Sequence, residues 1–177
     1  IKAIDYLTTF SKLIRTLLQN SDKRQISLYD EIETCKLYTQ LEMMRFGGKL
    51  NCTFQIDPDL DTKSVMVPAL IIQPFIENAI WHGIVPKENG GTIFINIKQQ
   101  GDQVLCEVDD DGIGRRLSQL NKPSDSLTHE SKGVRLSQAR LDLEKTLNDN
   151  NTGIKIYDKF DLGVPMGTKV ILSFNLN

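Results

Sequence analysis

The stretch QPFIENAIWHG, from Gln73 to Gly83, places three polar side chains in a segment that is otherwise apolar and of helical length. Asn78 and His82 are four residues apart, so a helix would put them on one face, with Glu77 one step round. Polar groups in a buried helix need partners. The three groups together could serve a metal–phosphate group, while a helix end with a satisfied core histidine is the simpler alternative.

A second polar stretch, VDDDGIG from Val108 to Gly114, follows a strand in which apolar residues alternate. Asp110 has the spacing to accept a hydrogen bond from an exocyclic amine such as that of adenine. Gly112 and Gly114 would let the backbone approach a flat ring closely. An acidic, glycine-containing turn at the end of a strand is the alternative interpretation.

Two further signals lie downstream. SKGVRLSQARL, from Ser131 to Leu141, places a lysine and a glycine immediately before a helix, where backbone N–H groups can bind phosphate; an ordinary capped helix is the alternative. The polar segment from Arg115 to Lys132 precedes it and is typical of a long loop over a ligand. Gly167 and Thr168 stand before the last predicted strand.

The N-terminal residues predict a helical hairpin. Residues 1–19 are amphipathic, with an apolar seam that is expected to pack on another helix. Ser27 is a predicted N-cap for a second helix, which Gly47 and Gly48 end. A two-helix hairpin usually needs a partner to cover its apolar stripe, so we expect half of a dimeric four-helix bundle. The seam of the first helix consists of Ala3, Leu7, Phe10, Ile14 and Leu17.

The remaining pattern predicts an α+β fold in which a mixed sheet is covered on one face by helices. A strand follows residue 48, a helix is expected from Pro68 to Gly83, and a β-hairpin follows it. A further helix is expected at about 133–147. Two closing strands are expected at roughly 153–160 and 168–175, joined by residues 163–167. The helical region is assigned to residues 1–48 and the α/β sandwich to residues 49–177.

Composition narrows the class of protein. The formal net charge of −2 gives no basic footprint for nucleic acid, so no nucleic-acid partner is expected. Cys35, Cys52 and Cys106 are odd in number and widely spaced, which indicates thiols rather than disulfides or a metal site. No apolar run has the length of about 18 residues that a membrane span needs, so no direct membrane contact is predicted.

Taken together and in this order, the signals resemble the nucleotide-binding boxes of the histidine kinase and gyrase-type ATPase fold. The chain is most similar to LytS/YehU-like sensor histidine kinases, which carry an RFGGKL-type helix end, a Gln-Pro-x-x-Glu-Asn box and a short DxGxG loop. The resemblance covers essentially the whole chain. The sequence departs from the pattern at Trp81, where a basic residue is common, at Ser131 and at Leu136.

The resemblance implies that the chain binds ATP with Mg²⁺. Asn78 would coordinate the ion that bridges the phosphates, and Glu77 would act as a base or orient another group. Asp110 would accept from the adenine amine, and Thr168 would support the adenine edge through water. The other residues expected to bind the nucleotide are His82, Gly83, Gly112, Gly114, Ser131, Lys132, Gly133 and Val134.

In that family the phosphate-accepting histidine lies upstream of the first helix seen here. The two histidines of the sequence, His82 and His129, fall inside the predicted boxes, so autophosphorylation of the chain is not expected. The resemblance implies a homodimer through the N-terminal helices and transfer to an aspartate of a response regulator receiver domain. It also implies the cytoplasmic part of a protein anchored in the bacterial inner membrane. An ATPase of the same fold and a noncatalytic signalling module with a decayed site are the alternatives.

Overall fold

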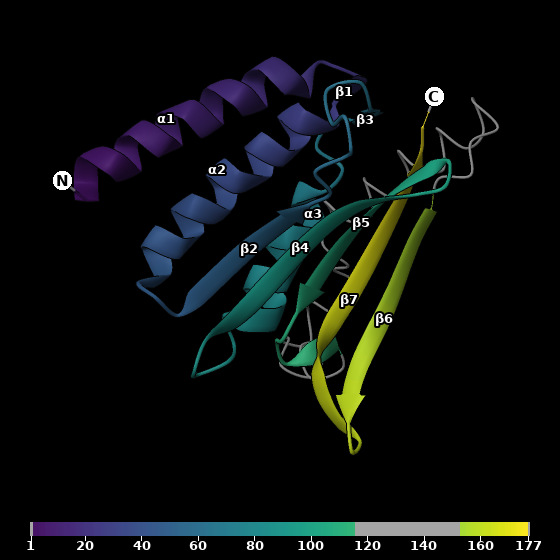
Figure 1. Cartoon of the computed structure of the whole chain (residues 1–177). Helices are drawn as coiled ribbons and strands as arrows, with labels where there is room; N and C mark the ends of the chain where they lie inside the picture. Colours follow the sequence, from purple (N-terminus) through teal and green to yellow (C-terminus); the bar gives the residue numbers. More distant parts are fainter. Residues whose placement is uncertain (1, 116–152, 177) are drawn as a thin grey trace.

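The computed structural model describes residues 2–115 and 153–176. It contains a helical hairpin and a five-stranded sheet with further helical segments on one face (Figure 1). In chain order the elements are α1 (Lys2–Ser21), β1 (Gln25–Ser27), α2 (Leu28–Phe46), β2 (Leu50–Ile56), β3 (Met66–Pro68), α3 (Gln73–Asn78), the π-helix η1 (Ala79–Ile84), β4 (Gly91–Gln100), β5 (Gln103–Asp110), β6 (Gly153–Asp161) and β7 (Val164–Asn175).

The sheet has the order β2-β4-β5-β7-β6, in which β2 and β4 are parallel and the other pairs are antiparallel. This mixed sheet confirms the predicted fold class. Alternate residues of β4 and β5 are buried against the helices, whereas the opposite face is polar and partly exposed. Ile93, Ile95 and Cys106 belong to the buried set, and with α3 they form the centre of the core.

Local sequence signals fix both ends of α2. The backbone N–H of Asp30 donates to Ser27 Oγ at 3.1 Å, which confirms Ser27 as the N-cap. Gly47, with a φ of +58°, ends the helix in the left-handed conformation. Leu28, Ile32 and Cys35 of α2 pack into the same core cluster as the sheet. The second helix is therefore bound tightly to the sandwich.

Most of the seam predicted on α1 is not buried against α2. Leu7, Phe10 and Ile14 are exposed in this chain, and the residues of α1 that are buried are Thr9, Leu13 and Asn20. The two helices lie side by side in Figure 1. Periodicity identified the apolar stripe of α1 correctly. It could not say which helix this stripe packs on, because α2 and a helix of another chain could both cover it.

The predicted helix from Pro68 to Gly83 is wrong in its first part. Met66–Pro68 forms the strand β3, which pairs with β1 in a small antiparallel sheet that the sequence did not reveal. Leu70 has a φ of +58°, and the helix begins only at Gln73. Nonlocal strand pairing and the left-handed turn override the helical pattern there.

The β-hairpin of β4 and β5 is confirmed, and its turn lies at Gly101 and Asp102 as predicted. The closing strands are also present, but β7 begins at Val164 instead of 168, because it pairs with β6 through residues that were assigned to the loop. The connection is a tight turn at Leu162 and Gly163, both with positive φ. The predicted loop beyond Arg115 and the helix at about 133–147 lie outside the described residues.

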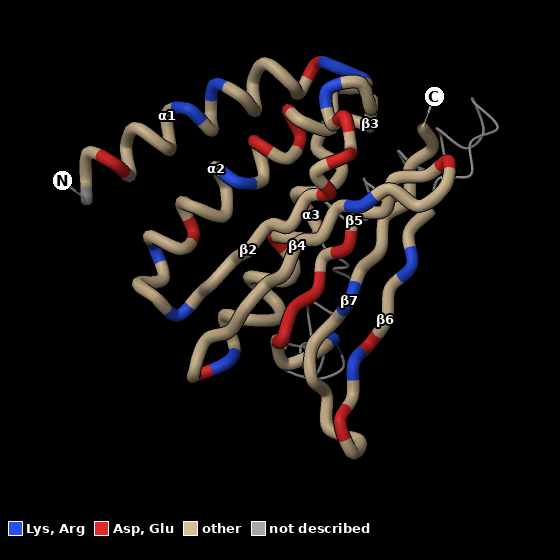
Figure 2. The backbone as a smooth tube through the Cα atoms, in the orientation of Figure 1, with Lys and Arg blue, Asp and Glu red and all other residues tan. Residues whose placement is uncertain are grey.

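Charged residues recur along α1 and α2 and along the strands β5, β7 and β6 (Figure 2). Lys98 and Lys169 both pair with Glu107, at 3.0 and 3.2 Å. Burial opposes ionisation of Glu107, but its hydrogen bonds and ion pairs with the two lysines hold its pKa below the ordinary value. Within the described ranges, no helix has the length and apolarity needed to cross a membrane.

Candidate nucleotide-binding site

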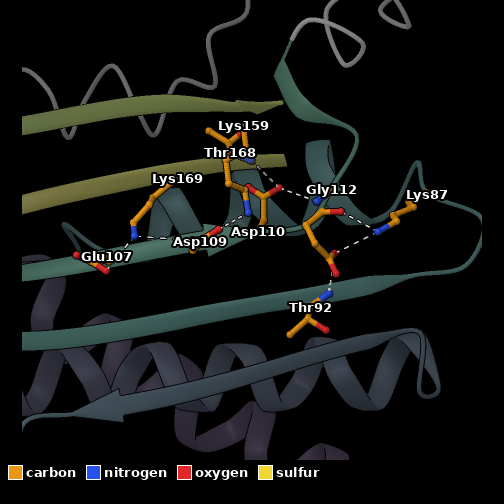
Figure 3. Close-up of polar contacts among 10 residues, drawn as sticks. Lys87, Thr92, Glu107, Asp109, Asp110, Gly112, Lys159, Thr168 and Lys169 are labelled. Atoms are coloured by element: carbon orange, nitrogen blue, oxygen red, sulfur yellow. Dashed lines mark hydrogen bonds and ion pairs between the residues drawn. The ribbon is translucent and has the colours of Figure 1, made fainter. Parts of the chain in front are cut away.

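Asp110 lies at the end of β5, where the backbone of four different segments converges. The carboxylate is buried, and its Oδ1 accepts from Gly112 N at 2.9 Å and from Thr168 N at 3.2 Å (Figure 3). Both hydrogen bonds that it accepts from described residues end on Oδ1, so Oδ2 can accept a further donor. Burial raises the pKa of Asp110 to about 6, although the two N–H groups oppose the shift.

Glycines allow this convergence. A Cβ added to Gly112 would lie 2.5 Å from Gly83 Cα, and one added to Gly83 would lie 3.0 Å from Asp110 Oδ1. Gly167, at a φ of +108°, would place a Cβ 2.0 Å from the carbonyl oxygen of Asp110. The backbones therefore pack directly around Asp110, which a side chain at any of these three positions would prevent.

Gly114 has a φ of +75°, a backbone conformation that favours glycine. A Cβ there would lie 3.0 Å from Pro165 Cβ on β7. The predicted adenine-side residues Asp110, Gly112, Gly114 and Thr168 are thus brought to one end of β5 and β7.

The asparagine-containing stretch forms α3 and continues into a π-helix. Asn78 is the last residue of α3 and is half-buried, while His82 is exposed on η1. Gly83 lies beside the turn after β5, because its carbonyl accepts from Ile113 N at 3.0 Å. π-Helical turns insert an extra residue per turn and are frequent at functional sites. Here the turn carries the chain from Asn78 to Gly83.

The described contacts of Glu77 are with its own helix and with α2. Its Oε1 accepts from Gln73 Nε2 at 2.7 Å, and its charge contributes to raising the pKa of both Tyr38 and Glu42 on α2, after the larger effect of burial. Glu77 therefore lies close enough to α2 to affect the charges on it. The predicted nucleotide ligands Ser131, Lys132, Gly133 and Val134 lie outside the described residues.

Sequence reasoning missed the residues that fix the turn after β5. Asp111 Oδ1 accepts from Thr92 N at 2.9 Å, and Lys87 Nζ donates to the Asp111 carbonyl at 2.7 Å (Figure 3). These contacts join the DDDG turn to β4 and to the segment after η1. The run of three aspartates was visible in the sequence, but the partners of Asp111 come from residues 19 and 24 positions away.

Trp81 was noted as a departure from the family pattern, and the structure gives it a partner surface. Its indole Nε1 donates to Tyr38 Oη at 3.2 Å, its ring lies edge-on to Phe46 with centroids 5.7 Å apart, and the Arg45 guanidinium lies 4.8 Å from its centroid. All three neighbours belong to α2. Trp81 thus joins η1 to the end of the helical hairpin.

Comparison with known proteins defines the class. The family described as histidine kinase matches residues 1–50. The sensor histidine kinase YpdA of Escherichia coli K12 is 36% identical over 104 residues, which are 59% of this chain and 18% of YpdA. The sensor protein LytS of Streptococcus mutans is 31% identical over 148 residues, which are 83% of this chain and 24% of LytS.

Solved structures agree in fold. The histidine kinase domain of a blue-light activated kinase from Erythrobacter litoralis has a TM-score of 0.56 at 17% identity, covering 97% of this chain and 75% of that one. Histidine kinase ThkA, in complex with response regulator protein TrrA, has a TM-score of 0.51 at 15% identity, covering 98% of this chain and 49% of ThkA.

The chain is similar in sequence to sensor histidine kinases and has the fold of histidine kinase catalytic domains. Sensor proteins of the LytS kind are among the curated relatives to which the chain is similar, as the sequence predicted. The chain spans about a fifth to a quarter of the length of YpdA and LytS.

Proposed function

We propose that the chain is the Mg-ATP-binding core of a sensor histidine kinase, which transfers the γ-phosphate of ATP to a histidine outside this sequence. The phosphoryl group then passes to an aspartate of a response regulator. The division into a dimerisation region at residues 1–48 and a catalytic region at residues 49–177 is part of this proposal. Kinship with sensor histidine kinases supports the reaction class, and the complex of ThkA with TrrA supports the kind of partner.

The observation that carries the proposal is the Asp110 carboxylate. A buried acceptor whose second oxygen can take a donor, bordered by the backbones of Gly83 and Gly112, suits the exocyclic amine and flat ring of adenine. Thr168 holds the same carboxylate from β7, which fixes its rotamer before a ligand arrives. Such preorganisation lowers the ordering cost of binding.

The residues present fit a magnesium ion that arrives with the nucleotide. Mg²⁺ keeps several waters and phosphate oxygens and needs only one or two protein oxygens. Among the described residues no group of three or more acidic, histidine or cysteine side chains gathers into a metal site, so a dedicated protein cage is not expected there. Asn78, half-buried at the end of α3, would supply its amide oxygen. The ion would neutralise charge on the phosphates during transfer.

The direction of Glu77 supports a role on the acceptor side. It lies with Tyr38 and Glu42 between α3 and α2, where a histidine carried by the helical region would approach the γ-phosphate. Glu77 is suited there to take a proton from, or to orient, the accepting imidazole. Homodimerisation through α1 would supply the helical surface, since Leu7, Ile14 and Leu18 are exposed on it.

The proposal is tested by calorimetric titration of the chain with a nonhydrolysable ATP analogue, with and without Mg²⁺. Binding should be stronger with Mg²⁺, and Asp110→Ala should weaken it by about 1 to 3 kcal/mol, or roughly 5- to 150-fold. Asn78→Ala should remove mainly the magnesium dependence. An analogue affinity unchanged in Asp110→Ala would contradict the site.

Two alternative functions are distinguishable from the proposed one. Release of phosphate from ATP by the chain alone would favour an ATPase of the same fold, in which a carboxylate is sought one turn before Asn78, where this sequence has Pro74. No binding at millimolar nucleotide would favour a noncatalytic signalling module. The arrangement of Asp110, Gly112 and Thr168 argues for a working nucleotide site instead.

A further inference from the structure

A second buried carboxylate, that of Glu31, lies in the first turn of α2. It is fully buried, and its two oxygens accept from different backbone groups: Oε2 from Leu70 N at 2.9 Å and Oε1 from Ile72 N at 2.8 Å. Within the described ranges, the partners that it shows are backbone N–H groups and not a cation. Burying a carboxylate costs free energy, so it is retained only where hydrogen bonds stabilise it.

The contact takes the place of a helix cap. The residue before α3, Ile72, has no side chain that could cap the helix, and Pro74 near the start has no N–H to be satisfied. Burial raises the pKa of Glu31, while the N–H groups of Ile72, Leu70, Gln73 and Ile71 oppose the shift. The two backbone donors just before α3, Leu70 N and Ile72 N, are therefore satisfied by one acceptor from another helix.

The geometry connects this acceptor to the phosphate side of the candidate site. Asn78 follows Ile72 by six residues, a helical rise of about 9 Å, and no flexible joint separates the two. At its other end the same helical segment is held against the adenine side, where Ile113 N donates to the Gly83 carbonyl. A change at the first end thus moves Asn78 more than it moves Gly83.

We propose that Glu31 is a positioning residue. By holding the start of α3, it sets the position of Asn78 relative to the metal-bound phosphates. This inference rests on the proposed nucleotide site. Because Glu31 is on α2, the orientation of the helical hairpin against the sheet sets the affinity for the phosphate end of ATP. The adenine end, which depends on Asp110, is independent of it.

The test separates the two ends of the ligand. Glu31→Gln keeps the shape of the side chain, but its NH₂ group cannot accept one of the two backbone N–H bonds. We expect its affinity for a Mg²⁺-bound nonhydrolysable ATP analogue to fall by about tenfold or more, which is about 1.4 kcal/mol. Its affinity for adenosine, measured by the same calorimetric titration, should stay within about twofold of the wild type.

Ile32→Ala provides the matched control. Ile32 is the next residue of α2 and is also buried, but its side chain cannot accept hydrogen bonds from the backbone at residues 70–72. It should lower stability through a core cavity while leaving both affinities within about twofold, at a temperature where circular dichroism shows both variants folded. Equal losses of analogue affinity in the two variants, or an unchanged affinity in Glu31→Gln, would overturn the positioning role.

A measurement on the wild-type chain decides the matter if Glu31→Gln does not fold. Coupling is reciprocal, so the Mg²⁺-bound analogue should slow hydrogen exchange at the Leu70 and Ile72 amides, and adenosine should not. Equal effects of both ligands on these amides would overturn the inference. Wild-type protein that binds neither ligand would instead contradict the proposed function itself.

Discussion

Replacing Asp110 with asparagine should stabilise the ligand-free protein while it weakens nucleotide binding. The pKa of Asp110 is raised from 3.8 to about 6, because the carboxylate is buried. The folded state therefore binds the proton more tightly than the unfolded state does. The stability contributed by the protonated acid is fully present below about pH 4, and it is lost as the pH rises through about 6.

The size of the effect follows from the shift. About two pKa units correspond to about 3 kcal/mol of unfavourable free energy when Asp110 is ionised at pH 7.5. Asparagine keeps an acceptor oxygen for Gly112 N and Thr168 N but never ionises. We therefore expect Asp110→Asn to raise stability at pH 7.5 by about 1 to 3 kcal/mol, or roughly 2 to 12 °C in Tm.

The assay is urea denaturation of both proteins at pH 7.5 and pH 4.5, together with titration by the ATP analogue. The stability gain at pH 4.5 should fall to about a third of its size at pH 7.5. Analogue affinity at pH 7.5 should fall about 5- to 150-fold. Asp109→Asn is the matched control, since Asp109 lies on the opposite face and pairs with Lys159 and Lys169. It should change stability by less than about 1 kcal/mol and leave affinity intact. A destabilised Asp110→Asn, or a gain that does not depend on pH, would refute the reasoning.

Three further outcomes follow from the packing. Gly112→Ala should cost about 1 to 3 kcal/mol in urea denaturation and abolish analogue binding, because the new Cβ would lie 2.5 Å from Gly83 Cα; normal binding would contradict that contact. Phe46→Ala should shift the emission of Trp81, the single tryptophan, to longer wavelengths, since it removes the ring packed edge-on against the indole; an unchanged spectrum would count against the packing. Leu7→Asp should change monomer stability by less than about 0.5 kcal/mol but dissociate the proposed dimer in sedimentation equilibrium, and a dimer that persists would place the interface elsewhere.

The parts of the fold that the sequence predicted correctly are those in which local and tertiary preferences agree. Ser27 and Gly47 end α2 through bonds and dihedral angles that involve only neighbouring residues. The alternation in β4 and β5 matches a sheet with one buried face. The part that was wrong, from Pro68 to Ile72, depends on the pairing of β3 with β1, which lies about 40 residues earlier. Apolar composition alone does not distinguish that strand and turn from a helix.

The candidate site divides in the same way. Asp110, Gly112 and Thr168 were predicted from the resemblance, and the structure brings them together. Glu31 was not among the predicted site residues. Its spacing held the missing signal, because Leu28, Glu31 and Cys35 recur at intervals of three and four along the buried face of α2. A carboxylate within such a stripe must find donors, but the sequence could not show that they belong to the backbone at Leu70 and Ile72.

The two buried carboxylates, Glu31 and Asp110, differ in how their oxygens are used, which suits one to hold the backbone and the other to bind a ligand. Burial raises the pKa of both carboxyl groups, so burial does not distinguish the two sites. Glu31 uses both oxygens on backbone donors of its own chain, and a ligand would have to break a native bond to reach it. Asp110 accepts both of its described bonds on one oxygen, and the backbones of Gly83, Gly112 and Gly167 pack closely around it. The unfavourable free energy of an ionised Asp110 is therefore relieved most by an external donor, which is the condition under which binding a neutral amine is favoured.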